Sequence, residues 1–141
     1  MLTRSLANRM TAAALARAAE LGVAVSVAVV DAGGHLVCFQ RMDGAEIAGP
    51  TLAVDKAFTA VAHRIATADL TARSAPGGDL AGLHANAGGR YVVFGGGLPC
   101  WAGGLVVGAI GVSGGTVEQD VACASAGAAV FESSAPAAPA D

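Results

Sequence analysis

The residue types best suited to chemistry gather around one glycine-rich segment, which consists of Gly95, Gly96, Gly97, Leu98 and Pro99 and is followed by Cys100 and Trp101. Successive backbone N–H groups in such a loop can bind a carboxylate or phosphate. The ring of Trp101 could form the flat wall of a pocket, and Cys100 could act as a nucleophile if its pKa were lowered. The structural alternatives are glycines needed for strand crossing, a tryptophan packed at an interface and an inert buried cysteine.

A second group of candidates lies at the end of a predicted strand, where Arg41 is followed by Met42 and Asp43. The guanidinium of Arg41 could clamp a substrate carboxylate through two hydrogen bonds. Its structural alternative is an ion pair with Asp43 or Asp55. We therefore treat Arg41 as a candidate catalytic residue, and Met42 and Asp43 as candidate ligand contacts.

Lys56 belongs to a predicted helix in which Thr59 and His63 share its stripe. Val54, Phe58, Val61 and Ile65 recur with helical spacing and are predicted to face the sheet. Because Lys56 is offset from this stripe by two residues, it is predicted to face away from the core of its own subunit. The stripe of Lys56 is then either a solvated face or half of a site between subunits.

His84 lies in a long connection, from Thr67 to Gly89, that we expect to fold near the glycine-rich segment. It is our preferred general acid or base, or axial ligand. Glu118 and Asp120 begin the last helix, where the helix dipole favours carboxylates in any case; Glu118 is a candidate ligand contact. The three histidines lack metal-binding helical spacing, and His35 falls in a predicted hairpin turn, so no structural metal is expected.

Gly111 to Gly115 satisfies the G-x-S-x-G pattern of hydrolases. No histidine follows Ser113, as the hydrolase order of residues requires. We interpret Ser113 as a turn residue.

Composition limits the classes of function. The chain has 141 residues, 54% of them hydrophobic and 13% charged, with a net charge of −3. Such thin polar coverage predicts a homo-oligomer, and the scattered basic residues argue against nucleic acid or a membrane surface as a partner. Arginines interrupt the first helix, so no signal peptide is expected and the predicted location is cytoplasmic. Three cysteines without paired spacing fit reduced thiols.

The pattern along the chain predicts an α/β (α+β) fold in one domain over residues 1–132. A helix ending at Gly22, a valine-rich strand from Val23, a hairpin at 31–34 and a helix after Pro50 come first. Strands are predicted at Tyr91–Phe94, near Cys100–Ala102 and at 105–112, before a last helix with a Thr116–Gln119 capping box. The expected architecture is three α/β/α layers around a five-stranded, mainly antiparallel sheet. The Ala/Pro-rich tail, residues 133–141, is predicted to be disordered.

Taken together, these motifs resemble the GlcG/HbpS-like family, also called DUF336 or haem-degrading domains and found in PduO-type proteins. The resemblance rests on Gly34–Ala45, Lys56–Ala60, Gly95–Pro99, Gly108–Gly115, Asp120 and Ala126–Gly127. It implies a profilin-like fold, assemblies from dimers to octamers, and links to haem binding and to glycolate and diol utilisation. Asp55 beside Lys56, and the Cys100–Trp101 pair, depart from the family pattern.

Three functions remain open at this point. The chain could bind haem or another planar anionic small molecule in a pocket at the Gly95–Pro99 loop, near a subunit interface. It could instead be an enzyme without a cofactor, a lyase, isomerase or hydratase acting on a small carboxylate through Arg41, Lys56, His84 and Cys100. It could also be a non-catalytic oligomeric scaffold, for which the composition alone would suffice.

Overall fold

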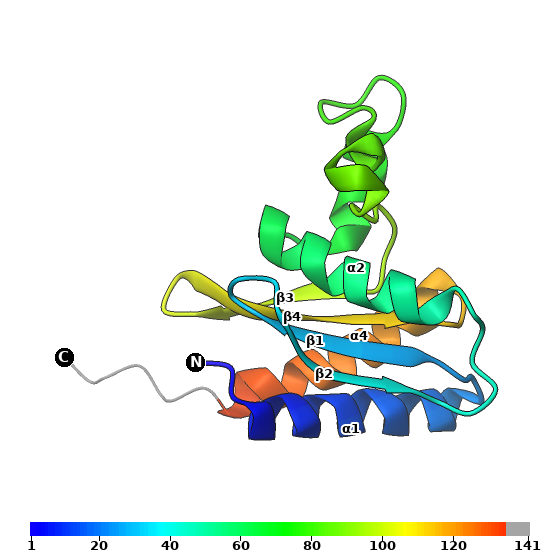
Figure 1. The fold of residues 1–141 in the computed structure, drawn as a ribbon, viewed down its shortest axis with the longest axis vertical. Helices are drawn as coiled ribbons and strands as arrows, with labels where there is room; N and C mark the ends of the chain where they lie inside the picture. The colour runs from blue at the N-terminus through cyan, green and yellow to red at the C-terminus, as the bar shows by residue number, and fades with distance from the viewer. Residues whose placement is uncertain (135–141) are drawn as a thin grey trace.

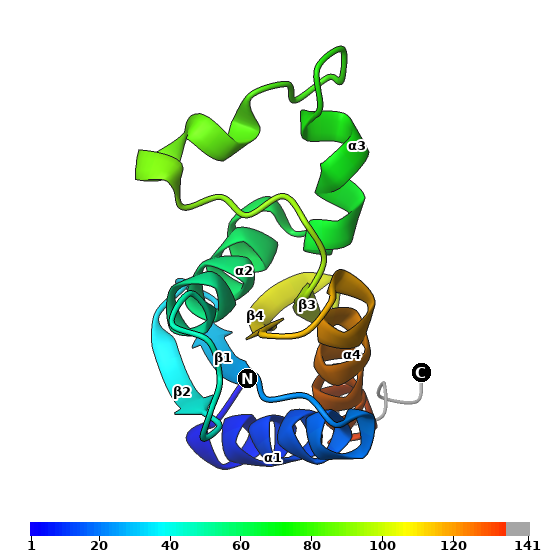
Figure 2. The same cartoon turned by 90° about the vertical axis from the view of Figure 1, so that its right-hand side faces the viewer.

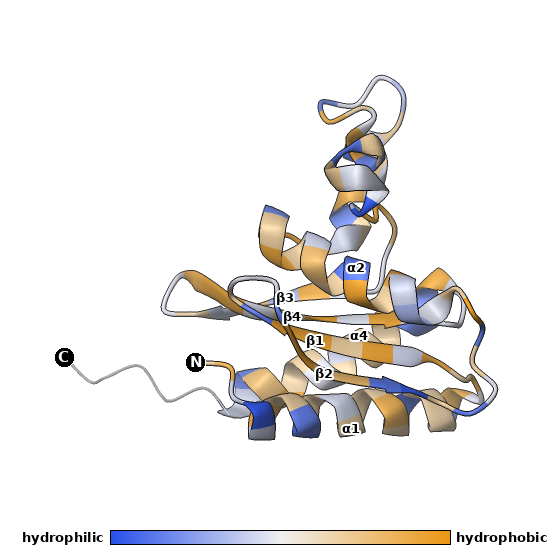
Figure 3. Cartoon of the chain, viewed as in Figure 1, coloured by the Kyte–Doolittle hydropathy of each residue, from blue (hydrophilic) through white to orange (hydrophobic). Residues whose placement is uncertain are grey.

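The computed structural model describes residues 1–134, and its centre is a four-stranded antiparallel sheet. The strands are β1 (Ser26–Asp31), β2 (Leu36–Arg41), β3 (Gly97–Ala102) and β4 (Leu105–Ser113), in the spatial order β2-β1-β4-β3. β1 and β4 therefore lie in the middle, while β2 and β3 form the edges (Figure 1). Figure 3 shows apolar residues concentrated along the central strands.

The predicted fifth strand, Tyr91–Phe94, is wrong, because this segment contains no strand. Its backbone bonds to side chains instead of to a neighbouring strand. The amide of Val92 donates to Oγ1 of Thr59 at 3.0 Å, and the carbonyl of Val93 accepts from Oγ1 of Thr71 at 2.6 Å. These bonds tie the segment to the helical layer and leave β3 as the edge strand.

Helices cover both faces of the sheet, giving the three expected layers (Figures 1 and 2). α1 (Arg4–Leu21) and α4 (Val117–Ser134) lie side by side on one face, and α2 (Gly49–His63) lies on the other. The larger core forms beneath α1 and α4, around Met10, Val27, Ile110 and Phe131. The helix ends follow the predicted signals: Gly22 caps α1 in a left-handed conformation, and Thr116 and Gln119 form the capping box of α4.

The predicted sheet-facing stripe of α2 is wrong. Ala53, Ala57 and Ala60 are fully buried against the sheet, whereas Val54 and Phe58 are only partly buried. A Cβ at Gly111 in β4 would collide with the carbonyl oxygen of Ala53, so the helix backbone rests almost directly on the strand. Only small side chains fit between two elements at that separation. The larger residues are consequently displaced to the flanks of α2.

After α2 the chain forms a projecting segment, residues 66–90, which we call the arm (Figures 1 and 2). It contains η1 (Thr67–Leu70), α3 (Thr71–Ser74), η2 (Leu83–Ala85) and η3 (Ala87–Gly89). Its own contacts hold it together: the amide of Leu80 donates to the Arg73 carbonyl at 2.8 Å, and Arg73 pairs with Asp79 at 2.9 Å. The predicted long connection is thus a structured projection.

α4 continues to Ser134, so the first two residues of the predicted disordered tail are helical, and the domain bounds stay a prediction. The remainder of the predicted disordered tail, residues 135–141, lies outside the described residues. Within residues 1–134, no helix is long and apolar enough to cross a membrane.

Candidate functional site

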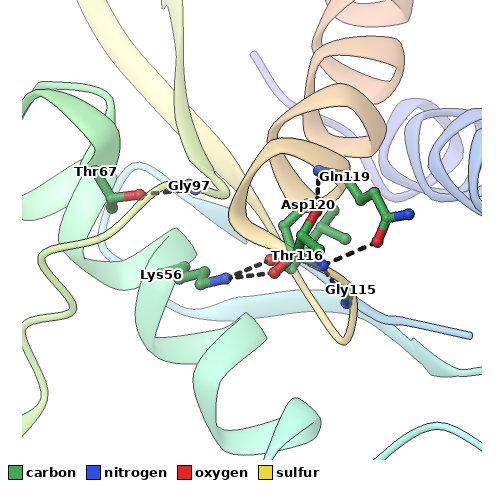
Figure 4. Close-up of polar contacts among 8 residues, drawn as sticks. Lys56, Thr67, Gly97, Gly115, Thr116, Gln119 and Asp120 are labelled. Carbon is green, nitrogen blue, oxygen red and sulfur yellow. Dashed lines mark hydrogen bonds and ion pairs between the residues drawn. The ribbon is translucent and has the colours of Figure 1, made fainter. Parts of the chain in front are cut away.

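The glycine-rich segment is buried in the chain, packed between α2, α4 and the start of the arm. Gly95, Gly96 and Gly97 are all buried. The carbonyl of Gly96 accepts from the amide of Val112 at 2.9 Å. The amide of Gly97 donates to Oγ1 of Thr67, also at 2.9 Å (Figure 4). The N–H group of Gly97 is therefore already hydrogen-bonded within the chain. Within one chain the expected anion-binding loop is not open to solvent.

Lys56 lies against this segment, and the prediction that it faces away from the core is wrong. Its side chain is fully buried. Nζ donates to the Val112 carbonyl at 2.9 Å and to Oδ2 of Asp120 at 3.1 Å (Figure 4). Asp120 also accepts from the amide of Gly115 at 2.9 Å through Oδ1. Because α2 packs closely on the sheet, the side chain of Lys56 is buried. The carboxylate of Asp120 balances the charge of its ammonium group.

Burial dominates the electrostatics of this pair. Desolvation lowers the pKa of Lys56 from its ordinary value, and the charge and hydrogen bond of Asp120 oppose that shift. The ring centroid of Phe94 lies 5.1 Å from Nζ, a cation–π distance. Because its charge is matched internally, Lys56 offers no free cation to an anionic ligand in this chain.

Sequence reasoning did not pair Asp120 with Lys56. In the sequence, Asp120 is one of two acidic residues that the helix dipole favours. The available signal was helical periodicity: Cys123, Ala124 and Gly127, three, four and seven residues further on, form the buried side of α4. A carboxylate on that side requires a buried partner.

Arg41 lies at the opposite edge of the sheet from the glycine-rich segment. Its exposed side chain donates to the carbonyl of Ala45 at 3.4 Å, and Asp55 pairs instead with Arg90 at 2.9 Å. Asp43 is exposed and forms no ion pair within residues 1–134. Two strands, β1 and β4, separate β2 from β3, a distance of about 14 Å at ordinary strand spacing. Arg41 and the glycine-rich segment are therefore not brought together within one chain.

Three further candidates have surroundings that limit their chemistry. The sulfur of Met42 accepts from the amide of Val25 at 3.3 Å and packs against the core. Cys100 is 2% exposed, and burial, reinforced by the charge of Glu132, raises its pKa to about 12. A thiol with that pKa is protonated near neutrality, so the geometry does not support a nucleophilic Cys100. Glu118 is exposed at the start of α4.

Trp101 is 49% exposed on the edge strand β3. With Pro99, Cys100 and residues of α4 it borders a hollow of only about 70 Å³. A drug-sized ligand needs several hundred Å³, so this hollow does not by itself form the pocket expected beside Trp101.

His84 is exposed in η2, which belongs to the arm. The elements packed against β3 are β4, α2, α4 and η1, whereas η2 packs against η3, so the expected approach of His84 to the glycine-rich segment is not found within one chain. The catalytic and ligand-binding roles predicted for these residues stay predictions.

Two larger hollows occur elsewhere. A groove of about 400 Å³ lies between β2 and α2 and is lined by Leu36, Phe39, Pro50, Thr51, Val54 and Asp55. A cavity of about 410 Å³ lies at the β1–β2 hairpin and includes His35, Asp31, Leu2 and Val107 in its lining. Sequence reasoning placed His35 in the turn but missed this cavity, because no local pattern predicts that the N-terminal residues pack there. Within residues 1–134, no group of three or more metal-ligating side chains is assembled.

Comparisons with known proteins agree with this fold. A family model described as haem degrading protein HbpS-like matches residues 2–129. The crystal structure of Klebsiella pneumoniae protein ORFY is 40% identical, covers 92% of this chain and 90% of its own, and superposes with a TM-score of 0.90. The crystal structure of a PduOC:heme complex is 41% identical, covers 87% of this chain and 89% of its own, and gives a TM-score of 0.85.

Among curated relatives, corrinoid adenosyltransferase PduO of Citrobacter freundii is 45% identical over 114 residues. The match covers 81% of this chain but 34% of PduO, so it spans about a third of that protein. With a family model that matches nearly its whole described length, the chain belongs to the HbpS-like family.

Proposed function

We propose that this protein binds haem. One observation carries the proposal: the likeness, at 41% identity and a TM-score of 0.85, to a PduOC structure that is a heme complex. Because the two chains are 41% identical over most of their lengths, we expect them to share the backbone around a bound ligand and to bind related ligands. Bound haem would supply an iron centre that can exchange electrons and axial ligands.

The described residues fit a haem in two respects. The chain presents large apolar side chains to solvent, including Trp101, Leu105 and Leu36. It also carries imidazoles, which serve as axial ligands of haem iron. Cys100 and Met42 are weaker donors here, because one is a buried thiol and the sulfur of the other is already engaged.

The predicted pocket at Gly95–Pro99 requires a second subunit on this proposal. Within one chain the glycines are buried and the hollow beside Trp101 is small. Trp101 and Leu105 project from the β3–β4 hairpin, 49% and 70% exposed, and we propose that a second copy covers them. Self-association of this kind hides apolar surface that a monomer would leave in water.

The alternative of a lyase or isomerase without a cofactor rested on Arg41, Lys56, His84 and Cys100 gathering at one loop. In the chain these four residues lie apart. Arg41 is on the edge strand β2 and His84 is on the arm, whereas Lys56 is buried in α2 and Cys100 is buried in β3. Haem binding needs no such convergence, and we therefore place it first. If the following test shows no specific haem binding, the protein is either a non-catalytic scaffold or binds another planar anionic ligand.

The test is titration of the purified protein with hemin, followed by absorption spectroscopy. We expect a saturable shift of the Soret band at one haem per subunit or per dimer. A shift that never saturates and does not respond to any histidine substitution is hydrophobic adsorption, and it would overturn the proposal. Sedimentation velocity on the same samples reports whether the binding species is an oligomer.

A further inference from the structure

We infer that residues 135–141, which we call the proline segment, fold back into the hollow beside Trp101 and cover this ring in competition with a second copy of the chain. The contact goes beyond the proposed function, because it forms whether or not the protein binds haem. A docked segment also differs from the disorder that the composition of this tail predicts.

The hollow beside Trp101 has room for one small apolar group. Its lining comes from two elements: Pro99, Cys100 and Trp101 of β3, and Ala128, Phe131 and Glu132 of α4. Its volume of about 70 Å³ is too small for a drug-sized ligand but exceeds the roughly 30 Å³ that one water occupies in the liquid. Apart from Glu132, the walls are apolar. A proline ring suits a hollow of this size and lining.

The two aromatic rings of this hollow differ in how far they are covered. Phe131 is 4% exposed and belongs to the main core, so this wall is fixed by the fold. Trp101 is 49% exposed, and it is the only tryptophan of the chain. Extended, proline-rich segments dock on aromatic surfaces of this kind, where the ring of the proline packs on the ring of the aromatic residue.

The proline segment has the composition that such a surface binds. Its sequence is Ala-Pro-Ala-Ala-Pro-Ala-Asp, in which two alanines separate Pro136 from Pro139. Because a polyproline II helix has three residues per turn, these two rings lie on the same edge of it. The fixed φ of proline also reduces the conformational entropy that docking costs. One proline ring can therefore fill the hollow while the other lies on the exposed part of Trp101.

The end of α4 brings the proline segment close to the hollow. α4 ends at Ser134, on the same side of the molecule as the β3–β4 hairpin (Figure 1). Phe131, which lines the hollow, precedes Ser134 by only one helical turn, about 5 Å along the axis. An extended chain covers about 3.1 Å per residue, so Pro136 and Pro139 can both reach back that far. A short tether of this kind gives an effective concentration on the order of millimolar, and even a weak contact is then populated.

The larger hollows are less suitable for the proline segment. The groove between β2 and α2 is lined by residues of those two elements, and the hollow at the β1–β2 hairpin is lined by the first two residues, the turn and Val107. Neither lining includes a residue of α4, from which the segment departs. The hollow beside Trp101 combines an aromatic wall with the end of that helix.

Docking of the proline segment opposes self-association through the β3–β4 hairpin. A second copy that covers Trp101 must contact the same exposed part of the ring. The two contacts exclude each other, so a chain with a docked segment is not competent to associate at this ring. The segment thus acts as an internal competitor that sets how tightly two copies bind.

The experiment follows the fluorescence of Trp101, which reports on this hollow because the chain has no other tryptophan. The wild type is compared with a chain truncated after Ser134 over a series of dilutions. We expect truncation to move the emission to longer wavelength and to raise the acrylamide quenching constant at least about twofold, as it should if the docked form is the majority. This difference should persist at the lowest concentration. Circular dichroism should stay unchanged, since every described helix and strand ends at or before Ser134.

A pair of double variants separates the proline rings from the length of the segment. Pro136→Ser with Pro139→Ser keeps the length but removes both rings, and it should behave like the truncated chain. Ala137→Ser with Ala138→Ser is the matched control, because it introduces the same two serines and keeps both rings. It should behave like the wild type.

Sedimentation equilibrium gives a second measurement. The truncated chain should associate at least about twofold more tightly, because the docked form no longer reduces the fraction of chains able to associate. Equal quenching of the wild type and the truncated chain at every concentration would overturn the inference. Protection of Trp101 that fades on dilution of the wild type would assign the cover to a second copy, and weaker association after truncation would mean that the segment bridges two copies; either result also overturns it. No hemin is present in these measurements, so their failure leaves the proposed function standing.

Discussion

The Cβ that Gly96 lacks would stand 2.8 Å from Nζ of Lys56 and 2.5 Å from the carbonyl oxygen of Val112. Gly96 also has a φ of +128°, a conformation that other residues rarely adopt. The glycine-rich segment therefore packs directly over the buried ion pair of Lys56 and Asp120, and this packing requires glycine at position 96. Any ligand at this loop must meet its outer side, where Phe94 is 39% exposed.

Replacing Gly96 by Ala should destabilise the fold by about 3 kcal/mol, because backbone strain and a clash with Lys56 and Val112 act together. Denaturant unfolding measures the change. The matched control is Gly104→Ala, which shares a positive φ of +78° but has nothing within 4 Å of the added carbon. We expect it to cost about 1 kcal/mol from backbone strain alone. Equal losses in the two variants would show that the contact with Lys56 is unimportant.

Asp120→Asn should lower the free energy of unfolding by about 3 to 5 kcal/mol near pH 7, the usual cost of leaving one buried charge without its partner. The asparagine keeps an oxygen for the amide of Gly115, so the loss reports mainly on Lys56. Glu118→Gln is the control, since Glu118 belongs to the same first turn but is exposed. It should change stability by less than about 0.5 kcal/mol. A similar effect in both variants would point to the helix dipole instead.

The depressed pKa of Lys56 gives stability a defined pH dependence. Between that lowered pKa and the ordinary value of 10.5, the unfolded chain binds more protons at Lys56 than the folded chain does. The contribution of Lys56 to the free energy of unfolding should therefore rise with pH across this window and level off above it. The difference between wild type and Lys56→Met, followed against pH, reports this contribution. A difference that stays flat or falls up to pH 10.5 would contradict the lowered pKa.

Cys100 should resist alkylation in the folded protein. Its pKa of about 12 and its 2% exposure leave almost no accessible thiolate at pH 8. Iodoacetamide followed by peptide mass spectrometry should label Cys100 only after unfolding, when all three cysteines react. Cys38 is partly exposed and is the internal reference for reagent access. Rapid labelling of Cys100 without unfolding would revive its predicted role as a nucleophile.

Local patterns in the sequence predicted the layers better than the contacts between them. The Gly22 cap, the hairpin at 31–34 and the Thr116–Gln119 box depend on neighbouring residues, and the structure confirms them. The orientation of α2 depends on Gly111, a residue of a distant strand, and so hydrophobic periodicity misassigned it. Large apolar residues normally mark the buried side of a helix, but here close packing reserves that side for alanine.

The candidate site was harder to predict for the same reason. Lys56 and Asp120 are 64 residues apart in the chain, and no motif links them. Val92 is apolar and suits a strand, yet its amide donates to the side chain of Thr59. The fifth strand that the sequence predicts therefore does not form. The hollow beside the β1–β2 hairpin forms because Leu2 and Val107 pack beside the turn. Such tertiary contacts are invisible to spacing within a segment.

Self-association should depend on the β3–β4 hairpin, where Trp101 and Leu105 are 49% and 70% exposed. Pro99 lacks an amide hydrogen, which disfavours edge-to-edge pairing along β3, so we expect contact through side chains. Burying an exposed tryptophan at an interface commonly contributes about 2 kcal/mol or more, and Trp101→Lys should weaken association at least about thirtyfold. Leu36→Lys, at 53% exposure on the opposite edge strand, is the matched control. Sedimentation equilibrium distinguishes the outcomes: a shift confined to Trp101→Lys places the interface at this hairpin, whereas a shift confined to Leu36→Lys moves it to β2 and contradicts the prediction.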